Sequence, residues 1–336
     1  MQKLLRKSSR VAVALMSMAA VASVAPNAGA QEVLPEQISS LLPKETVDQV
    51  NAAVSSAQEQ VDQAVQQVQQ AVQPAQQEYA DQGFQPIVDG PNYHWTNDLS
   101  SQVMAATPGP VLHRVQGSWF NAPDVPAESI EAEKQGESLY GPGTPIYVGD
   151  NDLCTVAFTG TDAAGRKLAV TAGHCGGVGS QVTSADSWRV GPSGTVAATN
   201  PNLDYSVIEL GSNAKITNTY NGVTVNQLGQ GSLAPGQVAC KSGVATGNTC
   251  GMTWSSQPNT QFTQICASQG DSGAPVLLGD RVVGMVNGGM LPIASASCRT
   301  PLQGPLFMPT VSVPVDSILA DLNSRDAVGT GFTPAS

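Results

Sequence analysis

The sequence has few charged residues, and its basic residues are fewer than its acidic ones. Only 12% of the 336 residues are charged, and the formal net charge is −11. No run of lysine or arginine occurs beyond the N-terminal end of the chain. Binding to nucleic acid depends on clustered basic side chains that release counterions, so we expect no nucleic-acid partner. The acidic balance favours solubility and does not identify a fold.

Long apolar runs are also missing after the N-terminus. Basic residues at the start of the chain precede an apolar stretch over 11–25 and a small-residue sequence, AGA, at 28–30. This pattern predicts a signal peptide over 1–30 that is cleaved after Ala30. An uncleaved membrane anchor is the alternative, but the apolar stretch is short for a span. We therefore expect a secreted protein, extracellular or associated with the cell envelope, with no membrane span after cleavage.

Glycine and proline are abundant, with 34 and 23 residues. This composition is typical of a loop-rich β protein rather than a helical bundle. The chain is long enough to bury a full core in one large domain or two smaller ones.

Cysteine is present in an even number, and every cysteine follows residue 150. In an exported protein this predicts three disulfides, although the sequence alone permits fifteen pairings. A zinc cluster is less consistent with the sequence, because it has no C-x-x-C pair and only one histidine lies near the cysteines. We expect no metal and no cofactor. The cysteines are Cys154, Cys175, Cys240, Cys250, Cys266 and Cys298.

A segment over 31–82 is rich in glutamine, alanine and valine. Apolar residues recur in it every seven positions, in two series spaced by three and four, which predicts a helix over about 43–73 with a heptad seam. The alternative is a solvated amphipathic spacer. The two series are Val47, Val54, Val61 and Val68, and Val50, Ala57, Ala64 and Ala71.

The next segment, over 83–145, is rich in proline, and Trp95, Trp119 and Phe120 indicate a small folded patch within it. From residue 146 onward the pattern changes to short β-rich runs separated by glycine-rich turns, which favours a sandwich or barrel. A helix is expected over 314–322, and residues 324–336 are expected to form a flexible tail. The β-rich runs cover 155–159, 168–171, 206–210, 274–278 and 281–286.

Two short motifs in this region carry chemistry. The sequence TAGHC at 171–175 places His174 where an apolar strand enters a turn of small residues. The sequence GDSGAP at 270–275 places Ser272 between glycines, which allow a sharp turn and expose the hydroxyl. A serine hydroxyl needs a base to become a nucleophile, and His174 is the only histidine after residue 146. The backbone amides of Gly270 and Ser272 are the expected donors to a developing oxyanion.

These motifs resemble those of the chymotrypsin-like serine peptidases, especially the secreted bacterial branch that includes streptogrisins and α-lytic protease. The resemblance covers about 146–323 and implies an all-β fold with two six-stranded antiparallel β-barrels and a short C-terminal helix. In that family the triad aspartate lies between the histidine and the serine, at the start of an apolar strand. Asp204 has this position, and Asp186 and Asp162 are the alternatives.

The resemblance also implies a disulfide pattern of Cys154–Cys175, Cys240–Cys250 and Cys266–Cys298. It further implies that Asp271 pairs with a cation, either a newly cut N-terminus or an internal arginine. Ile146 resembles a mature N-terminus, so residues 31–145 are expected to be a pro-region that acts as an inhibitor or folding aid.

Substrate is expected to bind along Asn287, Gly288 and Gly289, where an extended peptide adds a strand to the sheet. The family usually has serine at position 287 and glycine at position 274, where this chain has Asn287 and Ala274. Asn287 either donates its amide to Asp204 or displaces it. The segment with Gln264 and Ile265 should form one pocket wall, with Val286 facing it. The pocket positions have no carboxylate that would favour arginine or lysine and no basic group that would bind glutamate, so we expect cleavage after small or medium uncharged residues.

The sequence therefore predicts a serine endopeptidase that acts on proteins or peptides. Two alternatives remain open. One is a chymotrypsin-fold binding protein with weakened catalysis, and the other is an envelope-associated module built on the N-terminal helix.

Overall fold

The computed structural model describes residues 90–149, 152–290 and 296–336, together with single helical positions at 44, 45, 48, 49, 52, 56 and 63. Two units are distinguished, Met1–Glu78 and Tyr79–Ser336. The predicted signal peptide and the eight residues of the heptad seam lie outside the described residues. The following concerns the second unit.

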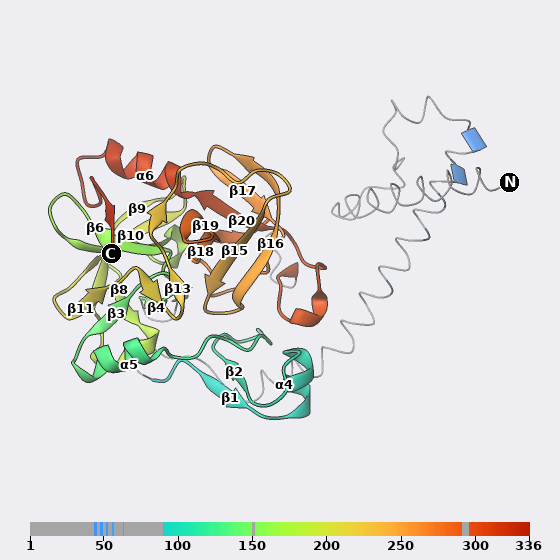
Figure 1. Ribbon diagram of the computed structural model, residues 1–336, viewed down its shortest axis with the longest axis horizontal. Helices are drawn as coiled ribbons and strands as arrows, with labels where there is room; N and C mark the ends of the chain where they lie inside the picture. Colours follow the sequence, from blue (N-terminus) through green and yellow to red (C-terminus); the bar gives the residue numbers. More distant parts are fainter. Residues whose placement is uncertain are drawn as a thin grey trace. The chain divides into compact units, whose positions relative to one another are not determined.

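The first of two large sheets is antiparallel and curves into a half-barrel (Figure 1). Its strand order is β21-β6-β7-β10-β9-β8-β4-β5. In β7 every residue after Lys167 is buried, which explains its continuous apolar run. The strands are β4 Pro145–Val148, β5 Asp152–Thr155, β6 Phe158–Thr161, β7 Lys167–Ala172, β8 Gln181–Ser184, β9 Gly194–Asn200, β10 Tyr205–Leu210 and β21 Thr333–Pro334.

The second large sheet closes into a six-stranded barrel, because β19 pairs with both β18 and β20. A seventh strand, β14, adds to β19 in parallel. The strands are β14 Gln227–Leu228, β15 Val238–Gly243, β16 Gly247–Gln257, β17 Thr260–Thr263, β18 Pro275–Leu278, β19 Arg281–Gly289 and β20 Thr310–Pro314. The predicted all-β fold is confirmed; of the two six-stranded barrels expected, the second sheet is a closed barrel of six strands and the first is an eight-stranded half-barrel.

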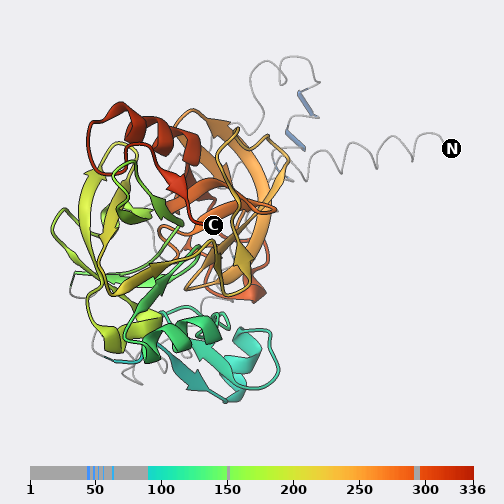
Figure 2. The same cartoon turned by 60° about the vertical axis from the view of Figure 1, so that its left-hand side comes forward.

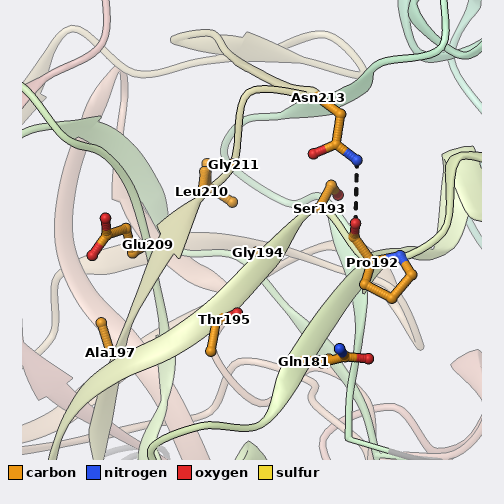
Figure 3. Close-up of a pocket in the computed structure, with 10 residues that line it drawn as sticks. All are labelled: Gln181, Pro192, Ser193, Gly194, Thr195, Ala197, Glu209, Leu210, Gly211 and Asn213. Atoms are coloured by element: carbon orange, nitrogen blue, oxygen red, sulfur yellow. Dashed lines mark hydrogen bonds between the residues drawn. The ribbon is translucent and has the colours of Figure 1, made fainter.

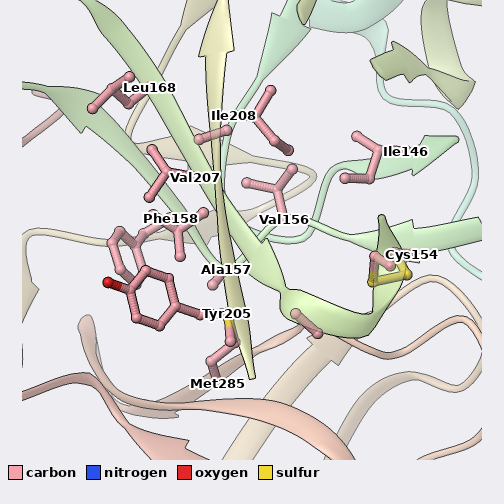
Figure 4. Packing of buried hydrophobic residues seen from close by; sticks show 14 of the residues in the cluster. Ile146, Cys154, Val156, Ala157, Phe158, Leu168, Tyr205, Val207, Ile208 and Met285 are labelled. Carbon is pink, nitrogen blue, oxygen red and sulfur yellow. A yellow bond between two sulfur atoms is a disulfide. The ribbon is translucent and has the colours of Figure 1, made fainter. Parts of the chain in front are cut away.

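The main core fills the first sheet and continues into the second. Phe158, Tyr205 and Ile208 are fully buried there, and Met285 joins them from β19 (Figure 4). A smaller cluster fills the second barrel, around Leu233, Ile265 and Val276. The junction between the two sheets is therefore apolar and rigid, which suits a site built from both.

The predicted C-terminal helix is present as α6, Val315–Ser324. Val315, Ile318 and Leu322 are fully buried and form the apolar face. Short elements complete this part of the fold: η1 Gly173–Cys175, η2 Ala185–Val190, η4 Pro301–Gln303, β12 Thr219–Tyr220 and β13 Val223–Thr224.

The expected flexible tail is instead ordered. After α6 the chain returns to the first sheet, where β21 pairs with β6. The ring of Phe332 packs edge-on against Phe158, with 5.4 Å between ring centroids. The tail has no helical or strand period, and only the exposed edge of β6 gives it a place to pair.

Residues 90–145 belong to the same folded unit as the two large sheets. They run along one side of both sheets, opposite α6 (Figures 1 and 2). Trp119 is buried in this segment, in agreement with the expected folded patch, whereas Trp95 is largely exposed. The elements are β1 His94–Thr96, α4 Leu99–Met104, β2 Val111–His113, α5 Ala127–Lys134 and β3 Ser138–Tyr140, which pairs in parallel with β11 Ala214–Ile216.

Candidate active site

Three polar side chains that are far apart in the sequence meet where the two sheets join. His174 lies in η1 after β7, Asp204 precedes β10, and Ser272 precedes β18. The Nδ1 atom of His174 lies 2.8 Å from Oδ2 of Asp204, and its Nε2 atom lies 2.8 Å from Oγ of Ser272. This is the hydrogen-bonding order of a serine nucleophile, a base and an orienting carboxylate.

The backbone fixes the position of Asp204 beside His174. Strands β7 and β10 are antiparallel neighbours, with Ala172 opposite Tyr205, so the residues that flank them meet at one end. The amides of Gly173 and His174 donate to the carbonyl and to Oδ1 of Asp204, each at 2.8 Å. A Cβ atom on Gly173 would approach Asp204 and Tyr205 to within 2.9 Å, which explains the glycine before the histidine.

The charges of this pair support each other. The hydrogen bond that His174 donates to Asp204 raises the pKa of His174 above its usual value, although burial opposes the charge. Burial also opposes the charge of Asp204, but hydrogen bonds from His174 and Asn287 outweigh it, and the pKa of the carboxyl is lowered. Asp204 is therefore ionised at neutral pH and stabilises the imidazolium that forms when His174 accepts a proton.

Asn287, in β19, donates to the aspartate. Its Nδ2 atom lies 2.9 Å from Oδ2 and 2.6 Å from the carbonyl oxygen of Asp204. Its Oδ1 atom accepts from the amide of Val313 at 3.0 Å, which fixes the orientation of the side-chain amide. The sequence left open whether Asn287 donates to Asp204 or displaces it, and in the structure Asn287 donates.

The loop around Ser272 is held from the first sheet. The hydroxyl of Thr155 donates to the carbonyl of Gly270, and its amide donates to the carbonyl of Ser272, both at 2.8 Å. Gly273 has a φ of +87°, and a Cβ atom there would lie 2.1 Å from the carbonyl oxygen of Thr155. Among the described residues, no acceptor binds the amides of Gly270 and Ser272. These amides are thus available to a ligand.

Asp271 has its cation inside the second barrel. Lys241, in β15, lies with its Nζ atom 3.6 Å from Oδ2 of Asp271, and both side chains are fully buried. Asp271 also accepts from the amides of Ala245, Thr246 and Ser268 and from the hydroxyl of Thr246. The expected partner was a new N-terminus or an arginine, and the structure has a lysine.

The three expected disulfides are present as Cys154–Cys175, Cys240–Cys250 and Cys266–Cys298. The first attaches the turn of His174 to β5, and the third attaches the segment before Ser272 to the loop before η4. Cys240 and Cys250 lie opposite each other on β15 and β16. Two of the three bridges therefore hold segments next to the candidate triad.

The alternative aspartates lie elsewhere. Asp186 accepts a buried hydrogen bond from Arg114, at 2.5 Å, and another from Tyr220. Asp162 pairs with Arg166. Asp204 alone of the three contacts His174 in the described structure.

The expected substrate-binding set needs correction. Ile265 and Val286 are 0% and 2% exposed, because their side chains point into the core of the second barrel. The side-chain amide of Gln264 donates to the carbonyls of Pro305 and Phe307 and so supports a neighbouring loop.

The glycines of β19 remain candidates for substrate binding. A Cβ atom on Gly288 would have no neighbour within 4 Å, so there is space beside Gly288, whereas a Cβ atom on Gly289 would meet the side chain of Met308 at 2.0 Å. In the segment before Ser272, Ala267 is partly exposed and Gln269 is exposed.

Sequence reasoning missed Lys241 and Thr155. A lone lysine inside a strand that begins with valine, alanine and cysteine was a detectable signal. Thr155 gave no signal, because its role comes only from contacts across the sheets.

A separate hollow of about 460 Å³ opens along β8, β9 and β10 (Figure 3). Gln181, Thr195 and Glu209 are among its lining residues. Asn213 and Pro192 also line it, and the side-chain amide of Asn213 donates to the carbonyl of Pro192. It contains none of the candidate catalytic residues.

Comparison with known proteins places this geometry in context. Serine protease 2 of Streptomyces fradiae is 30% identical over 174 residues, which cover 47% of this chain and 96% of that protein. Streptogrisin-C of Streptomyces griseus is 28% identical over 178 residues, which cover 48% of this chain and 38% of that protein. An uncharacterized protein of Mycobacterium tuberculosis (strain CDC 1551 / Oshkosh) is 37% identical over 168 residues, which cover 44% of this chain and 73% of that protein.

Among solved structures, Thermobifida fusca protease A is 27% identical, covering 59% of this chain and 100% of that chain, with a TM-score of 0.44. No family model matches the chain. The match to Serine protease 2 extends over almost the whole of that protein. The chain therefore belongs to the chymotrypsin-like serine proteases of the streptogrisin branch.

Proposed function

We propose that the protein is a secreted endopeptidase that hydrolyses peptide bonds through an acyl-enzyme on Ser272. The observation that carries this proposal is the pair of 2.8 Å hydrogen bonds that His174 makes to Asp204 and Ser272. In the first step, the Oγ atom of Ser272 attacks the scissile carbonyl carbon while its proton moves to Nε2 of His174. His174 then gives this proton to the leaving amine.

The acyl-enzyme is hydrolysed by the same steps with water as the nucleophile. Water loses a proton to His174, attacks the ester carbonyl, and Ser272 recovers the proton as it leaves. Asp204 keeps the Nδ1 proton of His174 in place and stabilises the imidazolium in both halves of the reaction. None of these reaction steps requires a metal or a cofactor.

The oxyanion hole is assigned to the amides of Gly270 and Ser272. Both have no acceptor among the described residues, and Thr155 holds the carbonyl side of the Gly270 peptide. Donors of this kind stabilise the tetrahedral intermediate by about 2.7–4 kcal/mol each. The buried pair of Lys241 and Asp271 supports a hole that forms without a new N-terminus.

We assign substrate binding to the strand at Asn287, Gly288 and Gly289, where an extended peptide adds by backbone hydrogen bonds. The residue before the scissile bond is proposed to be uncharged and small or medium. In support, the segments 264–269 and 286–289 contain no charged residue. Digestion of a peptide library should give cleavage after alanine, valine or leucine. Strong cleavage after arginine, with little after these three, would contradict this specificity.

Export rests on the predicted signal peptide over 1–30, and the three disulfides support an oxidising compartment. No described helix is long and apolar enough to cross a membrane. N-terminal sequencing of the exported protein tests cleavage after Ala30.

A fluorophosphonate probe tests the catalytic assignment, because it reacts rapidly only with an activated serine. We expect labelling of the wild type and of Ser324→Ala, and none of Ser272→Ala. Ser324 is a matched control, because its hydroxyl only donates to the carbonyl of Asp321 at the end of α6. Equal, slow labelling of wild type and Ser272→Ala would favour a binding protein without catalysis.

A further inference from the structure

The segment 114–119 lies behind the loop that carries the candidate oxyanion hole. The hydroxyl of Ser118 donates to the carbonyl of Ala245 at 2.8 Å, and Ser118 is only 3% exposed. The amide of Ala245 in turn donates to Oδ1 of Asp271 at 2.9 Å. Ser118 is thus linked to Asp271, the residue between the two proposed oxyanion donors, through one intervening residue, Ala245.

A second contact comes from the same segment. A Cβ atom on Gly270 would meet the side chain of Val115 at 2.9 Å, so Val115 closes the space behind Gly270. The amide of Trp119 donates to the carbonyl of Arg299 at 2.7 Å. Arg299 follows Cys298, whose disulfide partner, Cys266, lies in the segment between β17 and Ser272. The segment therefore contacts the loop of Ser272 both directly and through its disulfide partner.

Arg114 and residues after this segment are anchored to the connections between strands of the first sheet: η2 and Ser193 lie between β8 and β9, and β11 follows β10. Arg114 and Asp186 form an ion pair of 2.5 Å in which each side chain is 1% exposed. Strand β3 pairs with β11, and the hydroxyl of Tyr140 lies 2.6 Å from that of Ser193. Loss of residues up to 145 would leave the Asp186 carboxylate buried without its cation, which is strongly unfavourable.

The expected mature N-terminus is also inaccessible. Ile146 is 0% exposed and lies in β4, between β5 and β8. Asp271, the residue that a new N-terminus would reach, is already paired with Lys241. Cleavage before Ile146 would remove contacts and supply no new ion pair.

We propose that residues 90–145 are retained in the active enzyme and that Ser118 is a positioning residue for the oxyanion hole. This rests on the proposed function of Ser272. A pro-region that is removed on maturation then lies within 31–89. Residues 90–145 are then a structural part of the protease that packs against the two sheets.

Intact mass of the labelled enzyme tests retention. The exported full-length product is treated with a fluorophosphonate, and the mass of every labelled species is measured. We expect the labelled species to include residues 90–336. A labelled species that begins near residue 146 would overturn retention while leaving the proposed function intact. If no species is labelled, the proposed function fails and this inference fails with it.

Kinetics of Ser118→Ala test the positioning role. Ser129→Ala is the matched control, because Ser129 is equally buried in the same part of the chain and its hydroxyl bonds to Ser187, at 3.0 Å. We expect Ser118→Ala to lower kcat about threefold to tenfold, the effect of one lost hydrogen bond, with KM within about twofold. Ser129→Ala should leave kcat unchanged, and Ser118→Thr should restore most of it. Wild-type kcat in Ser118→Ala would overturn the positioning role.

Discussion

Replacement of Lys241 by methionine removes the cation beside Asp271 and keeps much of the side-chain volume. Both side chains are fully buried, with 3.6 Å between Nζ and Oδ2. Burial lowers the pKa of Lys241, although the nearby Asp271 charge opposes this effect. In the variant, the Asp271 carboxylate stays in the interior with no positive partner. This unpaired charge destabilises the folded loop that carries Gly270 and Ser272.

The expected cost follows from the contacts that remain. Removing one partner of a buried ion pair typically costs about 3–5 kcal/mol. Asp271 keeps its hydrogen bonds from Ala245, Thr246 and Ser268, so we expect the lower end, about 3 kcal/mol. If the loop rotates to bring the carboxylate toward water, the amide of Gly270 leaves the oxyanion hole. Loss of one such donor lowers kcat by about a hundredfold or more.

Urea unfolding and steady-state kinetics on an uncharged peptide substrate measure the two effects separately. Lys241→Arg is the control, because it keeps a cation and should retain most of kcat. Wild-type kcat/KM together with a wild-type unfolding midpoint in Lys241→Met would refute the reasoning. Loss of stability with unchanged kcat would show that the pair supports the barrel without positioning the oxyanion hole.

Three further predictions concern other parts of the site and fold. Asn287→Ala should lower kcat about tenfold, since Asp204 loses a donor, whereas Asn287→Ser should retain more activity in the same assay. The pKa of His174 is raised above 6.5 and its neutral form is the active base, so kcat/KM should fall when the pH drops through that raised pKa. Asp204→Asn should move this acidic side of the pH profile to lower pH. An acidic side below 6.5 in the wild type would contradict the effect of Asp204. Phe332→Ala should lower the free energy of unfolding by about 1–3 kcal/mol, since it removes the ring packed on Phe158, and leave kcat unchanged; an unchanged unfolding midpoint would indicate that the tail is not docked.

The residues of the candidate triad differed in how well the sequence identified them. His174 and Ser272 each stand in a local motif, and glycine is required next to both because the backbone passes close to Asp204 and Thr155. Asp204 could be selected only by its place before an apolar strand, with Asp186 and Asp162 as alternatives. The contacts of those two with Arg114 and Arg166 separate the three. Such contacts join distant parts of the chain and leave no local pattern.

The pocket residues show the same limit. Ile265 and Val286 were expected to face substrate, but both side chains are buried in the core of the second barrel. The tail and the segment 90–145 have no regular apolar period in the sequence, because their strands are short; β3 and β21 pair with strands that lie far away in the chain.

What the sequence determined by itself was the all-β class, the protease family, the six cysteines as three disulfides, and the histidine and serine that carry the proposed chemistry. These depend on composition, on alternation and on short motifs, all of which are local. Only the tertiary structure decided that Lys241 pairs with Asp271, that Asn287 donates to Asp204, and that residues 90–145 pack with the protease. Each of these contacts joins residues that are far apart in the sequence. A buried charge or hydrogen-bond donor needs a partner, and the tertiary fold determines which residue is close enough to be that partner.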